Sequence, residues 1–426
     1  MIKMVIKKLY NDKNKVLIAL SVGNILEFYD FALYGLLAPK IAILFFPNNS
    51  DLISLILTFS IFTIGFIARP FGALLFGYIG DRYGRSLSLS YSLLLMGIIT
   101  CLIGILPTYN EIGILAPLFL CILRILQGIC MGGEFSGSLI LVSELLSNKK
   151  HKALYTSVCS AAGVSGWLLA AFIVFISNQF NYISYSWRLP FILSGSTAFV
   201  GYFIRQSLNN TEKVLSNLKT KQYNKFSITS LLSQSILPFL IMVCIGGCMG
   251  IIFYGQFIFQ NTFLTSILKV NTNLALLAIM IGISSYMVFL PIFGWLSDKI
   301  GHSNTMMFSA ISIMLLSYPI YNCFITKDYI KIILAEVLSG AILALFMGPA
   351  TYVMTTLFHI RMRYTGVSFG YNVGASLFGG ITPTISMLLY QLNLNPMDPF
   401  LYLAFAGVLG IFGTYLYQKL GNNLTN

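Results

Sequence analysis

The chain has 426 residues, of which 57% are hydrophobic and only 9% are charged. Soluble globular domains carry about 25% charged residues, so this composition excludes a soluble protein and indicates an integral membrane protein. The formal net charge of +13 is also found in nucleic-acid-binding proteins. Here most of the basic residues fall in short loops between apolar segments, which argues against a nucleic-acid partner.

Segment 1–15, "MIKMVIKKLYNDKNK", is basic and precedes a long apolar run. A signal peptide has a shorter apolar region that ends at a small-residue cleavage site. Neither feature is present, so we interpret segment 1–15 as a cytoplasmic tail before the first spanning helix.

Twelve apolar segments follow, and each is long enough for the roughly 20 residues of a transmembrane helix. They are 16–44, 52–79, 87–107, 112–146, 153–177, 187–207, 231–262, 274–296, 305–325, 329–357, 364–390 and 399–418. We therefore predict an all-α integral membrane protein with two six-helix bundles, 16–208 and 231–418. A cytoplasmic linker at 209–230 joins them, and 419–426 is a second cytoplasmic tail.

The lysines and arginines predict the orientation, because cytoplasmic loops carry an excess of both. With the N-terminus inside, most of the 26 basic residues fall on the inner side. Four fall on the outer side (Arg188, Lys269, Lys327 and Lys331), and three lie within spans (Lys40, Arg69 and Arg124). The net charge is thus a topology signal, and both termini are expected in the cytoplasm.

All seven cysteines lie within apolar segments, without CxxC or Cys/His ligand spacing. They are expected to be small buried hydrophobic residues rather than disulfides or metal ligands. We predict no metal and no cofactor.

Two loops share a motif at matching positions of the two halves. "GYIGDRYGRS" (77–86) follows the second span, and "GWLSDKIGHS" (294–303) follows the eighth. Both fit G-x-x-x-D-[RK]-x-G, in which glycines permit a tight turn and close helix approach. One copy alone fits an ordinary basic inner loop equally well. Two copies indicate a transporter built from internal repeats.

The first copy resembles the signature loop of the major facilitator superfamily, with Ser86 where Arg or Lys is commoner. Other stretches resemble its metabolite:proton symporter branch: "GNILEFYDFALYG", "ARPFGALLFGYIGDRYGR", "RILQGICMGGEFSGSLILVSE", "IRQSLNNTEKV" and "YTGVSFGYNVGASLFGGITP". That branch includes proline/betaine, shikimate, citrate and 2-oxoglutarate carriers. The resemblance implies the major facilitator fold, with the two bundles pseudo-symmetric. It also implies an inner-membrane, proton-coupled symporter that works by alternating access and imports a small carboxylate-bearing metabolite or a zwitterion.

Ionisable side chains within spans are costly and are functional candidates by default. Asp30 lies near mid-depth of the first span, and Glu27 is three residues earlier on the same face. By resemblance to proton-coupled sugar carriers, Asp30 carries the proton and Arg124 is its ion-pair partner, with Glu27 and Glu134 close by. A static ion network that orients helices is the alternative. No role is assigned to Glu336.

If Arg124 is paired with Asp30, Arg69 is the freer guanidinium for a substrate carboxylate. Further candidates are expected either to present an aromatic face to a cationic group of the substrate or to form hydrogen bonds with it. For each of them, a packing role is the alternative. These are Tyr29, Tyr34, Tyr254, Gln127, Gln256, Tyr371 and Asn372.

Gating residues are expected at the inner loops. The first motif supplies Gly77, Asp81, Arg82, Gly84 and Arg85, and the second supplies Asp298. The resemblance further suggests that Glu144 pairs with Arg82 or Arg85.

Other functions are less consistent with the sequence. A channel is expected to show a pore signature such as TVGYG, and a membrane enzyme or ATP-driven pump a catalytic or nucleotide motif; the chain has none of these. A passive facilitator or exchanger of the same solutes stays open. The expected partners are a small-molecule substrate, protons and the lipid bilayer, with no nucleic acid, and the protein is expected to be a monomer.

Overall fold

The computed structural model describes residues 21–83, 85–146, 150–179, 185–206, 236–359 and 362–425. Within these ranges every regular element is helical, which confirms the predicted all-α class. The predicted N-terminal tail and linker 209–230 lie outside the described residues. The exact boundary between the two bundles therefore stays a prediction.

The first half contains six predicted spans, two of which are broken into shorter helices. Its helices are Ser21–Leu36, α2 (Ala38–Phe45), α3 (Asp51–Tyr83), α4 (Arg85–Ile105), α5 (Tyr109–Ile112), α6 (Leu115–Cys130), α7 (Glu134–Leu145), α8 (Lys152–Gln179) and α9 (Arg188–Gln206). The helix Ser21–Leu36 meets α2 at an angle of 59°. The predicted span 112–146 divides into α6 and α7 around Gly132 and Gly133, which have low helix propensity.

The second half also contains six predicted spans. Its helices are α12 (Ile236–Tyr254), η1 (Gly255–Phe259), α13 (Gln260–Thr262), η2 (Phe263–Ile267), α14 (Thr272–Ile300), α15 (His302–Ile325), α16 (Tyr329–Thr356), α17 (Arg363–Gly374), η3 (Ala375–Gly379), α18 (Thr382–Asn393) and α19 (Phe400–Thr425). The elements η1, η2 and η3 are wide π-helical turns inside longer spans. Such turns often mark functional sites.

Ten of the described helical segments are long and apolar enough to cross a bilayer, and the bent pair Ser21–Phe45 makes an eleventh. The predicted segment 187–207 forms α9, which falls below that test although it packs along α4. Its serines, glycines and terminal arginines lower its hydropathy. One face of α9 packs on α4, while Leu189, Leu193 and Phe199 are exposed.

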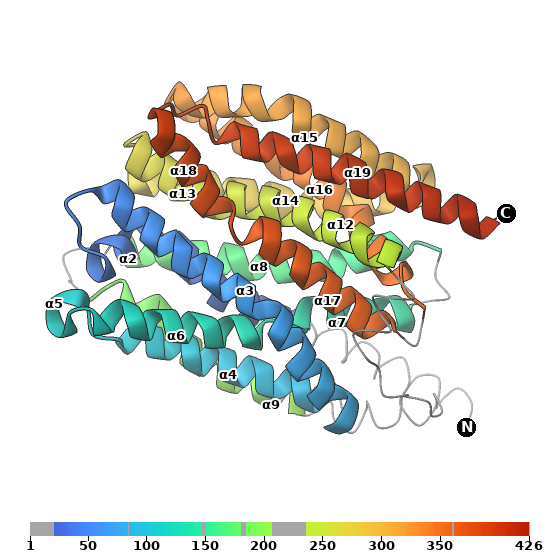
Figure 1. The fold of residues 1–426 in the computed structure, drawn as a ribbon, viewed down its shortest axis with the longest axis horizontal. Helices are drawn as coiled ribbons and strands as arrows, with labels where there is room; N and C mark the ends of the chain where they lie inside the picture. The colour runs from blue at the N-terminus through green and yellow to red at the C-terminus, as the bar shows by residue number, and fades with distance from the viewer. Residues whose placement is uncertain are drawn as a thin grey trace.

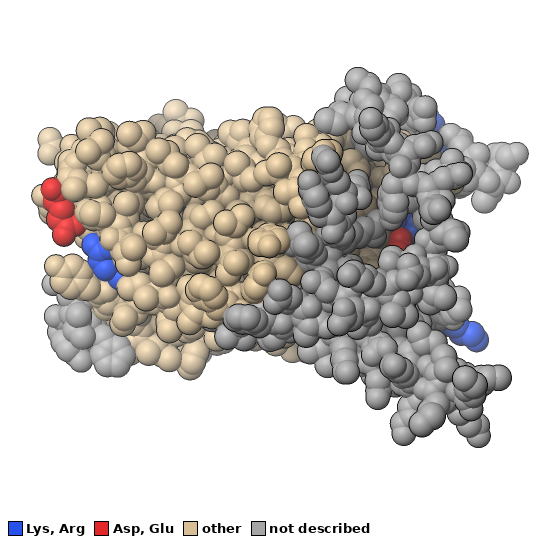
Figure 2. Space-filling model, turned by 90° about the horizontal axis from the view of Figure 1, so that it is seen from below, with Lys and Arg blue, Asp and Glu red and all other residues tan. Residues whose placement is uncertain are grey.

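The two halves lie side by side with their helices roughly along one direction (Figure 1). α8 packs against α14 and α16, and α3 packs against α17 and α18. The interface between the halves is thus formed by helices that are far apart in sequence. Figure 2 shows a broad uncharged surface on the described part of one face, with charged atoms near its ends, as expected for a membrane-facing belt.

Close helix approach within the first half depends on glycine. A Cβ atom at Gly128 of α6 would lie 1.9 Å from the carbonyl oxygen of Gly65 on α3, and one at Gly72 would lie 1.9 Å from that of Ile129. Small residues let membrane helices pack backbone to backbone. This contact fixes the depth of α6 against α3, and with it the positions of Arg69 and Arg124.

Candidate functional site at the interface of the two halves

Arg124 lies in the middle of the apolar interior on α6 and is fully buried. Its guanidinium carbon is 4.4 Å from the ring centroid of Tyr34, 4.8 Å from that of Phe31 and 5.2 Å from that of Phe62. Its Nη1 donates to Gln127 Oε1, one helical turn away. Its Nε and Nη2 have no hydrogen-bond partner among the described residues, so one edge of the guanidinium is unused.

Asp30 is buried on the helix Ser21–Leu36, where its Oδ1 accepts a hydrogen bond from Ser194 Oγ of α9. The expected ion pair with Arg124 is not formed, since no nitrogen of Arg124 lies within 4.0 Å of the Asp30 carboxylate. Gln127 lies between them instead. Its Nε2 donates to the backbone oxygen of Asp30 at 3.4 Å and to Thr100 Oγ1 at 2.7 Å.

Arg69 on α3 links the two halves. Its Nε donates to Asn372 Oδ1 of α17 at 3.0 Å, and its Nη1 donates to the Tyr254 hydroxyl of α12 at 3.3 Å. Asn372 Nδ2 in turn donates to the backbone oxygen of Gly132 at 2.5 Å. The expectation that Arg69 is the freer of the two guanidiniums is therefore corrected: Arg69 is engaged by neutral partners across the interface, and Arg124 has the unused donors.

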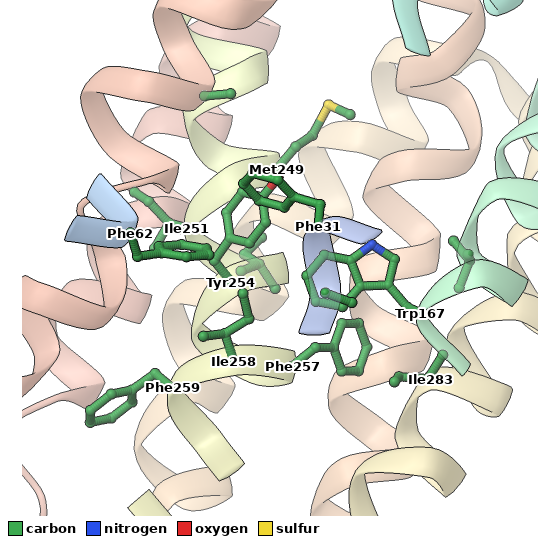
Figure 3. Close-up of a cluster of buried hydrophobic side chains, with 14 of the residues drawn as sticks. Phe31, Phe62, Trp167, Met249, Ile251, Tyr254, Phe257, Ile258, Phe259 and Ile283 are labelled. Atoms are coloured by element: carbon green, nitrogen blue, oxygen red, sulfur yellow. The ribbon is translucent and has the colours of Figure 1, made fainter. Parts of the chain in front are cut away.

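Aromatic rings separate and support the two arginines. Phe31 contacts both guanidiniums, at 4.8 Å from Arg124 and 5.8 Å from Arg69. Tyr254 packs edge-on against Phe66, with ring centroids 4.7 Å apart. Its ring centroid lies 6.0 Å from that of Phe62 and 6.2 Å from that of Trp167, and Figure 3 shows Phe31 beside it. We use the name central cluster for Arg69, Arg124 and Asp30 together with the rings of Phe31, Phe62, Phe66, Trp167 and Tyr254. Together they form a charged site enclosed by apolar walls.

Glu27 and Tyr371 also belong to this region. Glu27 is 3% exposed and acts electrostatically on Arg69, Tyr254 and Tyr371. The Tyr371 ring is 5.9 Å from the Arg69 guanidinium. The structure thus brings together residues from both halves that sequence reasoning proposed separately.

Contacts between the halves close the central cluster at both ends. At one end Ser136 Oγ and Ser368 Oγ are 2.7 Å apart, and Thr156 Oγ1 and Thr351 Oγ1 are 3.0 Å apart. At the other end Asn261 Nδ2 donates to the backbone oxygen of Leu36 at 2.9 Å. The described helices of the two halves therefore contact each other at both ends of the central cluster.

Asp298 of the second motif copy joins the halves at the first of these ends. Its carboxylate accepts from the backbone N–H groups of Ala153 and Leu154, both at 3.1 Å, and so caps the N-terminus of α8. Gly294 lets α14 approach α8, and Gly301, with φ of +98°, makes the turn into α15. Of the two roles expected for the motif glycines, Gly294 thus permits close helix packing and Gly301 permits the tight turn.

Several predicted residues lie elsewhere or outside the described part of the chain. The Tyr29 hydroxyl donates to the backbone oxygen of Pro190 at 2.7 Å, which is a contact within the first half. Gln256 contacts Glu336 inside the second half. Glu144 lies partly buried near the end of α7. The side chains of Asp81, Arg82, Arg85 and Glu134, together with Gly77 and Gly84, lie outside what the structure describes.

The sequence reasoning missed Thr100, Ser194 and the three phenylalanines around the arginines. Thr100 and Ser194 each place a hydroxyl group within an apolar span. A polar group at such a position could have marked both residues as site candidates. Phe31, Phe62 and Phe66 carried no comparable signal, because a phenylalanine in a membrane helix faces lipid as often as it faces a site.

Residues 20–383 match the family model described as Major Facilitator Superfamily. The chain belongs to this superfamily. The match covers most of both halves and confirms the resemblance drawn from the motifs. The chain is a multi-pass membrane transporter and not an enzyme.

Curated relatives are similar over nearly the whole chain. Inner membrane metabolite transport protein YhjE of Escherichia coli K12 is 32% identical over 404 residues, which cover 92% of this chain and 91% of the relative. The proline/betaine transporter of the same strain is 29% identical, covering 96% and 84%. The glycine betaine/proline/ectoine/pipecolic acid transporter OusA of Dickeya dadantii is also 29% identical, covering 95% and 83%.

Solved structures share the fold at low identity. The crystal structure of a D-xylose-proton symporter superposes with a TM-score of 0.71 at 16% identity, over 95% of this chain and 97% of that one. The partially occluded inward-open conformation of the xylose transporter XylE from E. coli gives a TM-score of 0.70 at 17% identity, over 95% and 97%. These likenesses show the architecture alone.

Proposed function

We propose that this transporter is a proton-coupled symporter of a small carboxylate-bearing solute, most simply a zwitterion of the proline/betaine kind. The observation that carries the proposal is the unused edge of Arg124. Its Nε and Nη2 form the side of the guanidinium that binds a carboxylate through two parallel hydrogen bonds. A buried donor pair without a partner is costly, so a carboxylate that enters the central cluster is stabilised there.

The rest of the cluster suits the cationic end of a zwitterion. The faces of Tyr254 and Trp167 lie close together, with ring centroids 6.2 Å apart, and aromatic faces attract ammonium groups. The buried carboxyl group of Glu27 lies nearby. Two of the relatives are named for proline and betaine transport, and both of those solutes combine a carboxylate with a cationic nitrogen.

Proton coupling follows from competition for Arg124. Without solute, Arg124 is free to approach Asp30, and the ion pair favours the carboxylate and expels the proton. With a solute carboxylate on Arg124, Asp30 has no cation partner, and its burial favours the protonated acid. In support of a carboxyl that can exist without this cation, Asp30 accepts a hydrogen bond from Ser194 and has no nitrogen of Arg124 within 4.0 Å. Solute and proton therefore bind together, which is symport.

We further propose that the protein acts as a monomer in the inner membrane with both termini in the cytoplasm. The inner-loop excess of lysine and arginine supports this orientation. The name of the YhjE relative supports the inner membrane.

Ligand-dependent thermal stabilisation of purified protein tests the solute site. Proline is compared with prolinamide, which lacks the carboxylate, in wild type and in Arg124→Lys. A charge-assisted hydrogen bond contributes about 1.5–3 kcal/mol, so we expect Arg124→Lys to weaken proline binding by roughly 10- to 150-fold. The matched control is Arg188→Lys, because Arg188 binds the backbone oxygens of Gly104 and Leu106 outside the cluster. Equal stabilisation by proline and prolinamide would remove the carboxylate from the proposal.

Proteoliposomes with an internal pH dye test the coupling. Addition of proline should acidify the vesicle interior, and an inward proton gradient should drive uphill uptake that an uncoupler abolishes. Uptake that follows only the solute gradient would favour the passive facilitator or exchanger over the symporter.

A further inference from the structure

Glu336 is a buried carboxyl in the second half, apart from the central cluster. It lies on α16 and is 0% exposed. A Cβ atom at Gly282 of α14 would lie 2.6 Å from its Oε2, so α14 packs directly over the carboxyl group. Its Oε1 has no hydrogen-bond partner, and no described Lys, Arg or His nitrogen lies within 4.0 Å.

The groups around Glu336 are neutral. Gln256 Nε2 of η1 donates to the Glu336 backbone oxygen at 3.2 Å and to its Oε2 at 3.4 Å. The neighbouring helices bring two buried phenols to this region, Tyr321 of α15 and Tyr286 of α14. The charged residues of α14, Asp298 and Lys299, lie 16 and 17 residues beyond Gly282, at the far end of that helix. On α16 itself, Lys331 is exposed. A carboxylate buried without a cation is so costly that such a group binds a proton.

A small cavity, lined mostly by apolar side chains, lies beside Gln256, the residue that contacts Glu336. Its volume is about 30 Å³, and its lining includes Gln256, Gln260, Tyr321 and Ser339. A water molecule requires roughly 10–15 Å³ by this measure, so the cavity has space for about two. It lies toward the end of the bundle where α15 leads into α16 and α18 into α19, because Phe324 and Pro399 also line it.

Two unsatisfied polar atoms belong to residues that line this cavity. Gln256 Oε1, on a side chain 6% exposed, has no donor, and Gln260 Nε2, on a side chain 2% exposed, has no acceptor. Buried polar groups are almost always hydrogen-bonded, to ordered water where protein partners are lacking. The pair therefore indicates water in the cavity, and water provides a path for protons.

A short chain of contacts connects Glu336 with the central cluster. Gln256 contacts Glu336, and Tyr254, two residues earlier, accepts a hydrogen bond from Arg69. The chain changes from α-helix to the π-helical turn η1 between these residues. A change in the hydrogen bond at Gln256 thus acts on the π-helical turn η1, which begins directly after Tyr254.

We propose that Glu336 is a second proton-binding site, which exchanges its proton with water that reaches it from the cavity beside Gln256. In the exchange the carboxylic acid gives its proton to a water molecule, leaving a carboxylate and a hydronium ion, and Gln256 Nε2 donates to the carboxylate. Proton binding at Glu336 does not depend on the proposed symport. A contribution of Glu336 to transport does rest on the proposed symport, and it would give each half one proton-binding group.

Infrared difference spectra of the purified protein in lipid, recorded between acid and alkaline buffers, test the proposal without any solute. We expect a carboxylic-acid carbonyl band that disappears as the pH rises and that is lost in Glu336→Gln. Asp328→Asn is the matched control, because Asp328 is an exposed acid at the N-terminus of the same helix and asparagine also caps helices. If Glu336→Gln does not fold, Glu336→Asp should keep a titrating band at a changed frequency.

The same spectra separate this site from the proposed carrier. Asp30→Asn should leave the Glu336 band in place, and Glu336→Gln should leave the Asp30 band in place. Identical difference spectra for wild type and Glu336→Gln would overturn the proposal, whatever the Asp30 variant shows. If the wild-type spectra contain the Glu336 band but no Asp30 band, the result would count against the proposed coupling and not against the Glu336 site.

Discussion

At the scale of single residues, the proposed symport depends on the charge state of Asp30. The carboxyl is buried and is held by a hydroxyl of Ser194 instead of a cation. In the proposed cycle, this carboxyl binds a proton and releases it when Arg124 approaches. The proposed coupling and the proposed solute binding therefore both depend on the guanidinium of Arg124.

Asp30→Asn should abolish proton-driven accumulation while solute exchange persists, because the amide occupies the same space but cannot ionise. The measurement is uphill uptake against counterflow of labelled proline in proteoliposomes. Asp51→Asn is the control, since Asp51 is an exposed acid in the first turn of α3. Normal uphill uptake by Asp30→Asn would sink the assignment of Asp30 as proton carrier.

At the scale of helices, glycine contacts set the depth of one element against another. The α3–α6 crossing brings backbone against backbone at Gly65 and Gly128. Both arginines of the central cluster lie on these two helices, so the crossing also fixes their spacing.

Gly128→Ala should destabilise the protein by about 1–3 kcal/mol, the usual range for overpacking, because its Cβ would overlap the Gly65 carbonyl oxygen. Thermal unfolding in detergent measures this effect. Gly133→Ala is a matched control, since its Cβ would meet only the Tyr364 hydroxyl, at 3.5 Å. Equal unfolding temperatures for the two variants would contradict the packing argument.

Asp298 acts at the same scale, as a cap that one half supplies to a helix of the other. Loss of a helix cap costs about 0.5–2 kcal/mol, so Asp298→Ala should shift the balance toward an open end by roughly 2- to 30-fold. We expect altered turnover with little change in proline affinity, because the cap lies away from the central cluster. Asp328→Ala removes the exposed cap of α16, formed with Ile330 N, and should leave turnover unchanged. A large loss of affinity in Asp298→Ala would refute a role confined to gating.

At the scale of the whole molecule, transport requires the two halves to separate at alternate ends. Ser136 of α7 and Ser368 of α17 face each other across the interface, with their hydroxyl oxygens 2.7 Å apart. This separation is compatible with the short Cβ–Cβ distance that a disulfide needs.

A Ser136→Cys/Ser368→Cys variant should therefore cross-link on oxidation and lose transport, with recovery on reduction. Mass spectrometry confirms the bond, and each single variant controls for the seven native cysteines. Full transport by the cross-linked protein would show that this end does not open during the cycle.

The sequence alone determined the membrane class, the approximate spans, the repeated motif and the residues of mid-membrane charge. Apolar length and charge placement are local properties of the chain, so the order of residues is enough to reveal them. The sequence also singled out Arg69, Tyr254 and Asn372, which contact one another across the interface of the halves, and Arg124 and Asp30, whose contacts lie within the first half.

Only the tertiary structure decided which of these side chains contact one another. It placed Tyr29 against Pro190 and Gln256 against Glu336, and it left Arg124 rather than Arg69 with unused donors. Sequence gives the depth of a residue along its helix, but its partner depends on how each helix is rotated and how the two halves meet. That arrangement is set by contacts between segments more than a hundred residues apart, such as Arg69 with Asn372, and no local pattern encodes it.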